Sequence, residues 1–112
     1  MLGTIVTVVI DRPLGSFHPE HKTLYYPINY GYIPHTQSHD GEEVDAYVLG
    51  INTPITTFTG RVIAVIHRID DVEDKWVVAP EGATFTAEEI QEQTRFQEQF
   101  FYPTLRWHNP KR

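Results

Sequence analysis

Residues 60–80 of this chain read GRVIAVIHRIDDVEDKWVVAP, and this stretch decides the class of fold. Positions 61–69 are rich in β-branched residues, which predicts a strand. The acidic run 70–74 predicts a turn, and positions 75–79 predict a second strand that a proline ends. We therefore expect two neighbouring strands joined by an acidic corner.

A similar arrangement lies upstream. Residues 4–10 are β-branched and barely alternate in polarity, which predicts a strand buried on both faces. Two prolines and a glycine make residues 13–24 a loop. Residues 25–34 then alternate aromatic with small side chains, and residues 44–49 predict a further strand. A second acidic corner, residues 40–45, separates these two segments, so the chain has two hairpin-like pairs of strands.

The C-terminal third predicts a helix. Thr86 and Glu89 have the spacing of a capping box, so the helix should begin near residue 87, and Pro103 should stop it near residue 101. We expect it to pack on the sheet through an apolar face that consists of Ile90, Phe96, Phe100 and Phe101. Strands first and a helix last predict an α+β fold, mainly β, in which an antiparallel barrel or strongly curved sheet carries a C-terminal helix.

Length and composition limit the class of protein. At 112 residues and 13.0 kDa the chain suits one hydrophobic core, so we expect a single domain over residues 1–112. Nine basic and 15 acidic residues give a formal charge of -6, which argues against nucleic acid or an anionic membrane as a partner. The absence of cysteine excludes disulfides and thiolate chemistry. No segment approaches the roughly 20 apolar residues of a membrane span and no leader is apparent, so we expect a soluble cytoplasmic protein.

The two acidic corners and Asp11 place several carboxylates at the ends of strands, where a curved sheet would gather them at one rim. Carboxylates gathered in this way repel one another at pH 7, and bound cations would relieve the repulsion. Oxygen ligands suit hard divalent ions such as Mg²⁺. The alternative is that each corner is simply a solvated turn, because Asp and Gly favour turns for backbone reasons.

Three tyrosines and a lysine accompany the corners. Tyr26, Tyr30 and Tyr32 share one parity in an extended segment, so their hydroxyls either face an anion held by metals or fill a small core. Lys75 directly follows the second corner, where an ammonium either balances charge or holds a phosphate. From the residues alone, both readings of each side chain stay open.

Residues 26–36, YPINYGYIPHT, and residues 40–45, DGEEVD, closely resemble the signature region of the soluble family I inorganic pyrophosphatases. The pattern of that family is Y-P-x-N-Y-G-Y-I-P-x-T followed by D-G-D-P-x-D, and the resemblance covers residues 4–80. It implies an OB-like five-stranded antiparallel barrel and Mg²⁺-dependent hydrolysis of pyrophosphate to two orthophosphates, with Mn²⁺ as a substitute cation. The implied partner is thus a small phosphate compound.

The resemblance also implies a role for each matching residue. The metal ligands would be Asp11, Asp40, Asp45, Asp70 and either Glu73 or Asp74. The residues that act on water and phosphate would be Glu42, Lys75, Tyr26 and Tyr30. Glu42 falls where the family has an aspartate that assists the attacking water, and Lys75 matches a phosphate-binding lysine.

The chain departs from the family pattern on the phosphate side. The segment between Asp11 and Tyr26 lacks a hairpin that carries a lysine, a glutamate and an arginine of the family's site. The candidates to replace them are His18, Glu20, His21 and Lys22. The family's Tyr-Lys pair near the C-terminus aligns loosely with residues 100–103, which contain no lysine.

These departures leave two other readings open. One is a weakly active or inactive relative that binds a phosphorylated ligand or a protein partner, and the other is a purely structural barrel. The aromatic-rich C-terminus, residues 100–107, also predicts that the chain forms a homo-oligomer, because a short chain cannot easily bury so much aromatic surface alone.

Overall fold

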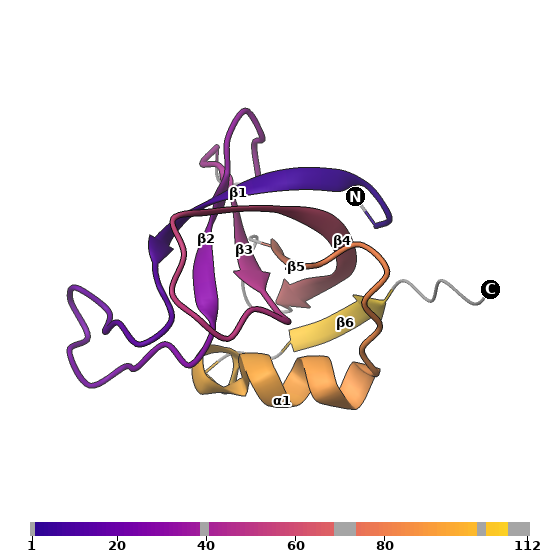
Figure 1. The fold of residues 1–112 in the computed structure, drawn as a ribbon. Helices are drawn as coiled ribbons and strands as arrows, with labels where there is room; N and C mark the ends of the chain where they lie inside the picture. Colours follow the sequence, from indigo (N-terminus) through magenta and orange to yellow (C-terminus); the bar gives the residue numbers. More distant parts are fainter. Residues whose placement is uncertain (1, 39–40, 69–73, 101–102, 108–112) are drawn as a thin grey trace.

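The computed structural model describes residues 2–38, 41–68, 74–100 and 103–107, the last of these by the backbone. In these residues the elements follow in the order β1 (Ile5–Arg12), β2 (Asn29–Ile33), β3 (Val44–Val48), β4 (Thr57–Arg68), β5 (Asp74–Ala79), α1 (Ala87–Glu98) and β6 (Pro103–Trp107). The strands curl into a barrel, and α1 lies against its outside (Figure 1).

Five strands close the barrel. They are hydrogen-bonded in the order β1-β2-β3-β5-β4, and the first half of β4 returns to β1, with Val9 opposite Thr57 and Ile5 opposite Arg61. The prediction of a five-stranded barrel with a C-terminal helix is therefore confirmed. Both predicted hairpins, β2 with β3 and β4 with β5, are antiparallel, but β3 and β5 pair in parallel. This parallel pair places the start of β3 beside the start of β5.

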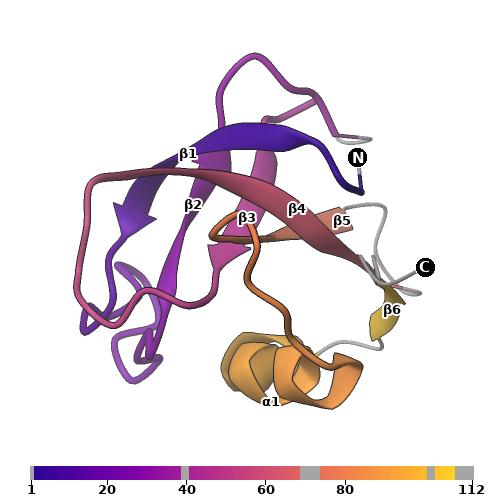
Figure 2. The same cartoon turned by 45° about the vertical axis from the view of Figure 1, so that its right-hand side comes forward.

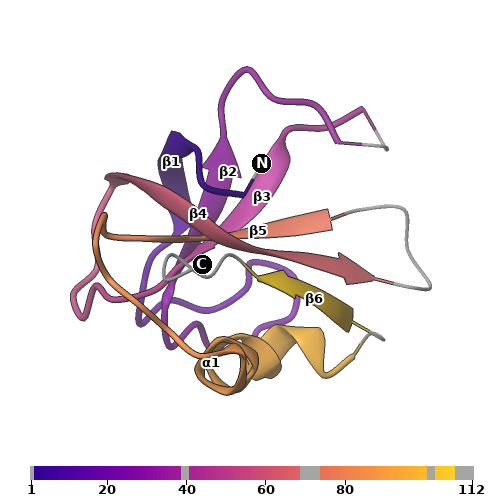
Figure 3. The same cartoon turned by 90° about the vertical axis from the view of Figure 1, so that its right-hand side faces the viewer.

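The long strand β4 serves different neighbours along its length. Residues 57–61 pair with β1, and residues 64–68 pair with β6 on the edge that β1 has left. The sequence did not predict β6, because the proline that opens it also marks the end of the predicted helix, and its five residues contain no β-branched run. Proline is tolerated there because the first residue of an edge strand need not donate a hydrogen bond. Strand β6 extends the sheet beyond the closed barrel (Figure 3).

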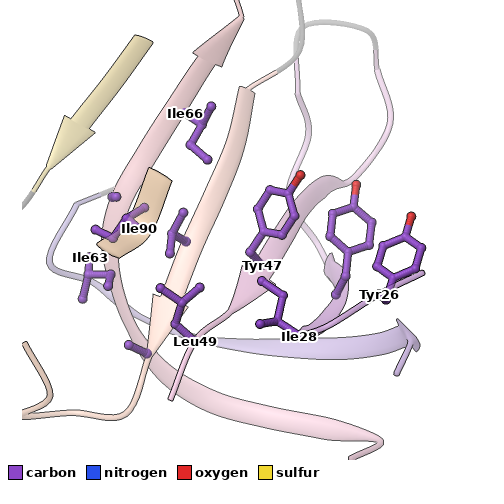
Figure 4. Close-up of a cluster of buried hydrophobic side chains, with 11 residues drawn as sticks. Tyr26, Ile28, Tyr47, Leu49, Ile63, Ile66 and Ile90 are labelled. Carbon is purple, nitrogen blue, oxygen red and sulfur yellow. The ribbon is translucent and has the colours of Figure 1, made fainter. Parts of the chain in front are cut away.

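Side-chain alternation gives the barrel an inner and an outer apolar layer. The inner layer fills the barrel with Val8, Ile10, Ile33, Val44, Ala46, Val48, Val62 and Val78. The outer layer lies between the barrel and α1 and contains Tyr26, Ile28, Tyr30, Tyr47, Leu49, Ile63, Ala64, Ile66, Val77, Ala79 and Ile90 (Figure 4). A bulge after Val62 turns both Ile63 and Ala64 outward, which enriches the layer that receives the helix.

The close approach of β1 explains why β2 has a glycine, Gly31, between two tyrosines. Gly31 lies opposite Ile10 of β1, and a Cβ at this position would collide with the carbonyl oxygen of Val9. Only glycine allows β1 and β2 to approach so closely. The tyrosines on either side, Tyr30 and Tyr32, pair with Arg12 and Val9 of β1 next to this close approach.

The helix begins as predicted and ends earlier. Thr86 and Glu89 form the capping box, with each side chain accepting a hydrogen bond from the other residue's backbone N–H. The predicted apolar face is wrong at Phe100, whose side chain is 68% exposed, because α1 ends at Glu98. The buried face is formed by Ile90, Thr94 and Glu98 at intervals of four residues. Phe101 lies outside the described residues.

Within the described part of the chain, no helix combines the length and the apolar character needed to cross a membrane.

Candidate functional site

Asp45 and Lys75 face each other across the parallel pair of β3 and β5. They occupy directly paired positions, and their side chains leave the barrel on its outer face. The Lys75 Nζ lies 2.6 Å from the Asp45 Oδ2, and the Lys75 side chain is 4% exposed whereas that of Asp45 is 31% exposed. A nearly buried ammonium therefore sits beside a carboxylate that solutes can reach.

Tyr30 completes this group. Its ring lies under the ammonium of Lys75, with the Nζ 5.9 Å from the ring centroid. Burial raises the pKa of the Tyr30 hydroxyl well above its usual value, and the negative charge of Asp45 raises it further. Tyr30 is consequently protonated at neutral pH and acts as a hydrogen-bond donor in the site.

A network of polar side chains joins the outer face to the end of α1. The Tyr26 hydroxyl donates to Gln97 Oε1 at 2.8 Å, and Gln97 Nε2 donates to the Tyr47 hydroxyl at 2.8 Å. The hydroxyls of Tyr26 and Tyr47 point the same way, away from the aliphatic part of the layer (Figure 4). This direction brings both hydroxyls to the last turn of the helix, where Gln97 links Tyr26, just before β2, to Tyr47 of β3.

An ion pair anchors the same turn. Glu98 accepts hydrogen bonds from Arg68 Nε at 3.0 Å and Arg68 Nη2 at 2.6 Å, and from the Tyr47 hydroxyl at 2.6 Å. Burial lowers the pKa of Arg68, but the hydrogen bonds and charge of Glu98 outweigh it and raise the pKa overall. Burial and the Glu98 charge likewise raise the pKa of Tyr47 well above its usual value, so Tyr47 stays a donor.

A cavity of about 760 Å³ lies on this outer face. Its walls come from β1, the connection between β1 and β2, strands β2 to β5, and the end of α1. Figure 2 shows this connection and α1 on the same side of the barrel. The lining residues are Arg12, His18, His21, Thr23, Leu24, Tyr30, Asp45, Arg68, Lys75, Phe96, Gln97, Gln99 and Phe100. Its volume is in the range of small-molecule sites.

The structure brings three of the predicted site residues together at the cavity: Tyr30, Asp45 and Lys75. Tyr26 is fully buried behind them, and its hydroxyl also accepts a hydrogen bond from Arg12 at 3.3 Å. Burial raises the pKa of Tyr26, while the contact with Arg12 opposes the rise. The rings of Tyr26 and Tyr30 thus pack in the outer layer, as one of the two interpretations predicted, and a role of their hydroxyls toward a metal-held anion stays a prediction.

Besides Tyr26, the predicted residues Asp11, Glu42 and Asp74 do not line the cavity. Glu42 is exposed in the connection between β2 and β3, where its carbonyl accepts a hydrogen bond from the Ser38 N–H at 2.7 Å. Asp74 has the opposite parity to Lys75 in β5, and its Oδ1 lies 2.6 Å from Nδ1 of His67. Strand alternation is the reason that adjacent residues of β5 cannot serve one face. Asp40, Asp70 and Glu73 lie outside the described residues.

Asp11 is a predicted metal ligand whose carboxyl group is affected by the charge of another, Asp45. Asp11 is exposed at the end of β1, next to a bulge between Ile10 and Arg12. Partial desolvation raises the pKa of Asp11, Arg12 opposes the rise, and the charge of Asp45 adds to it. Among the described residues, no group of three or more acidic or histidine side chains is close enough to hold a metal ion.

Gln97, Arg12 and Arg68 are residues of this region that the sequence did not single out. Gln97 lies seven positions after Ile90, so the helical period alone would have placed it on the buried face. The two arginines carry no such signal. Arg12 and Arg68 end strands β1 and β4, and only the closed barrel shows that both ends meet one cavity.

Comparison with known proteins gives one consistent result. A family model described as inorganic pyrophosphatase matches residues 8–109. The inorganic pyrophosphatase of Rhodospirillum rubrum is 38% identical over 77 residues, which cover 63% of this chain and 42% of that protein. That of Caulobacter vibrioides is 39% identical over 86 residues, covering 70% of this chain and 48% of the relative. The chain spans about half the length of the curated relatives it matches.

Solved structures show the same fold. The inorganic pyrophosphatase of Ehrlichia chaffeensis superposes with a TM-score of 0.71, covering 96% of this chain and 88% of that chain at 19% identity. The inorganic pyrophosphatase of Helicobacter pylori gives a TM-score of 0.65, covering 99% of this chain and 90% of that chain at 18% identity. At these identities the likeness establishes the barrel and its helix.

Proposed function

Because the chain belongs to the inorganic pyrophosphatase family, we propose that it hydrolyses inorganic pyrophosphate to two orthophosphates with the help of a divalent cation, Mg²⁺ or its substitute Mn²⁺. The observation that carries the proposal is the group of Asp45, Lys75 and Tyr30 on one cavity wall. A carboxylate, an ammonium and a protonated phenol side by side offer a cation ligand and two donors to a phosphate.

The donor set fits a hard divalent cation. Asp11 and Asp45 supply carboxylate oxygens from neighbouring parts of the rim, and their mutual repulsion favours a positive charge nearby. We propose that Asp40, Asp70 and either Glu73 or Asp74 are further ligands, since their positions match the family pattern, and we favour Glu73 because Asp74 pairs with His67. The chemistry that such a cation supplies when bound is activation of water and neutralisation of phosphate charge.

The chain's own residues would act on the phosphate groups. Lys75 is already desolvated, so its ammonium can hold a phosphate oxygen at little further cost in solvation. Tyr30 donates a hydrogen bond because its pKa is raised by burial and by Asp45. Gln97 and Tyr26 hold the wall behind Tyr30 in place. We propose that Glu42 orients the attacking water, as its position in the motif implies.

A phosphate-release assay with pyrophosphate and MgCl₂ tests the function. We expect turnover that chelation of the metal abolishes and that Asp45→Asn lowers by at least about 100-fold, since misplacing a reacting group costs that much. Glu42→Gln should lower kcat while leaving the affinity for Mg²⁺ unchanged. Wild-type protein that releases no phosphate with Mg²⁺ or Mn²⁺ would refute the proposal. Binding of pyrophosphate without release, measured by calorimetry, would identify the inactive relative instead.

We also propose a cytoplasmic location, one functional domain over residues 1–112, and self-association. Cell fractionation tests the location.

A further inference from the structure

The connection between β1 and β2 folds back as a small hairpin at the cavity. Gly15 N–H donates to the Tyr26 carbonyl at 2.8 Å, and Tyr26 N–H donates to the Ser16 carbonyl at 2.9 Å. An isolated bridge between Phe17 and Tyr25 continues this pairing outward. The hairpin therefore has a defined backbone, and its tip carries two histidines, both of which line the cavity.

The first of these histidines closes the tip with its own ring. His18 Nδ1 accepts hydrogen bonds from the backbone N–H of Glu20 at 3.0 Å and of His21 at 3.1 Å. A ring nitrogen that accepts two hydrogen bonds carries no proton, so the proton of the neutral imidazole is on Nε2. The His21 ring lies close by, with the two centroids 4.8 Å apart. His18 thus presents the Nε2–H donor on the side of the ring opposite the Nδ1 that binds the backbone of the hairpin tip.

Arg12 supplies the positive charge beside the two rings. Two other cations of the cavity are already paired, Lys75 with Asp45 and Arg68 with Glu98. In the described part of the chain Arg12 has no ion pair with a carboxylate, and its guanidinium contacts the Tyr26 hydroxyl and ring. A guanidinium has five N–H donors, and a single contact to a phenol leaves most of them available to an anion.

We propose that Arg12, His18 and His21 form a phosphate-binding wall that takes one phosphoryl group of the diphosphate substrate. This inference rests on the proposed function, because the wall belongs to the same cavity as Lys75 and Tyr30. The guanidinium binds phosphate oxygens through paired N–H donors, and the imidazoles add directional hydrogen bonds. Desolvation, Arg12 and His21 all lower the pKa of His18, which agrees with a neutral donor at Nε2.

Two substitutions separate the structural role of the His18 Nδ1 from the proposed ligand-binding role of its Nε2. His18→Asn places Oδ1 where Nδ1 accepts the backbone hydrogen bonds, but it is too short to reach the Nε2 position. His18→Gln reaches the Nε2 position with an amide N–H but loses the acceptor for the two backbone hydrogen bonds at the hairpin tip. Lys22 was also a candidate from the sequence, but it is exposed and absent from the cavity walls, so Lys22→Ala, which removes a cation of the same hairpin, is the matched control.

Kinetics with pyrophosphate and calorimetry with imidodiphosphate, a non-hydrolysable analogue, give the readouts. We expect Arg12→Met and His18→Asn each to raise KM and the dissociation constant of the analogue by roughly 10- to 100-fold, the usual range for a lost hydrogen bond to a charged group. His18→Gln should retain more affinity than His18→Asn, and Lys22→Ala should match the wild type. In the wild type, the NMR signal of His18 Nε2 should shift when the analogue is added.

The outcomes distinguish this inference from the proposed function. A wild type that hydrolyses pyrophosphate, with KM unchanged in Arg12→Met and His18→Asn, overturns the inference and leaves the function standing. A wild type that binds the analogue through these residues without turnover overturns the function and supports the inference. An unchanged His18 Nε2 signal at saturating analogue also overturns the inference, and this measurement needs no variant to fold.

Discussion

Lys75 and Asp45 neutralise each other at 2.6 Å, so a cation that binds Asp45 has to compete with the Lys75 ammonium or displace it toward the substrate. Their pairing depends on register, because each occupies the outward position of its strand at the same level. At the scale of single residues, the site is therefore a pair of charges that can exchange partners. Asp45 would turn to the metal and Lys75 to the phosphate.

This exchange gives the two partners opposite effects on metal affinity. Removing the competing ammonium in Lys75→Met should strengthen Mg²⁺ binding by about tenfold, because a like charge beside the cation is removed. Asp45→Asn should weaken Mg²⁺ binding by about tenfold or more, because it removes a ligand. Both variants should lose turnover. Calorimetric titration with MgCl₂ measures the affinities, and weaker binding in both variants would contradict the exchange.

At the scale of the element, the alternation of side chains along β5 places Asp74 on the side of the strand away from the site. Lys75, Val77 and Ala79 face outward, whereas Asp74 lies on the other side and pairs with His67. The sequence left Glu73 and Asp74 as alternative ligands. Glu73→Gln should lower Mg²⁺ affinity and turnover, and Asp74→Asn, a substitution of similar size one position away, should leave both close to wild type. A larger loss in Asp74→Asn would show that β5 uses its other face.

The last turn of α1 is held to the barrel by a buried ion pair. Side chains of Arg68 and Glu98 are 5% and 4% exposed, so removing one charge leaves the other buried without compensation. Glu98→Gln should lower the free energy of unfolding by about 3 kcal/mol. It should also raise KM, because Phe96 and Gln97 of the same turn line the cavity.

Glu92→Gln is the control for this prediction. Glu92 pairs with Arg95 at 3.2 Å on the exposed face of the same helix, where both side chains are more than half exposed. The substitution should change the free energy of unfolding by less than about 0.5 kcal/mol. Urea unfolding of both variants gives the comparison. Equal losses in the free energy of unfolding would mean that burial of Glu98 does not increase the contribution of its ion pair to stability.

At the scale of the whole molecule, the radius of gyration of 13.0 Å is that of a compact chain of this length. Self-association would therefore use surface side chains rather than an open core. Among the residues whose side chains the structure describes, the exposed aromatic ones available for it are Phe17, Tyr25 and Phe100. Light scattering coupled to size exclusion should give at least twice the 13.0 kDa of the chain, and Phe100→Ser should lower the mass. A monomer at micromolar concentration would refute the prediction.

Local patterns in the sequence determined the elements. Density of β-branched residues located β1 and most of β4, although β4 begins at Thr57 and not at residue 61. Apolar runs bounded by turns located β3 and β5, and the capping box located the start of α1. These signals are local, because strand propensity and capping depend on residues close in sequence. The motif around Tyr30 and Asp45 also identified the family, which the match over residues 8–109 confirms.

Tertiary structure alone decided which residues meet. Asp45 and Lys75 are 30 positions apart and come together through a parallel pairing that no local pattern encodes. Closure of the barrel left an edge of β4 for β6, and it brought Arg12, His18 and His21 to the cavity of Lys75. The reason is that register and closure follow from burying both apolar layers at once, and this is a property of all the strands together.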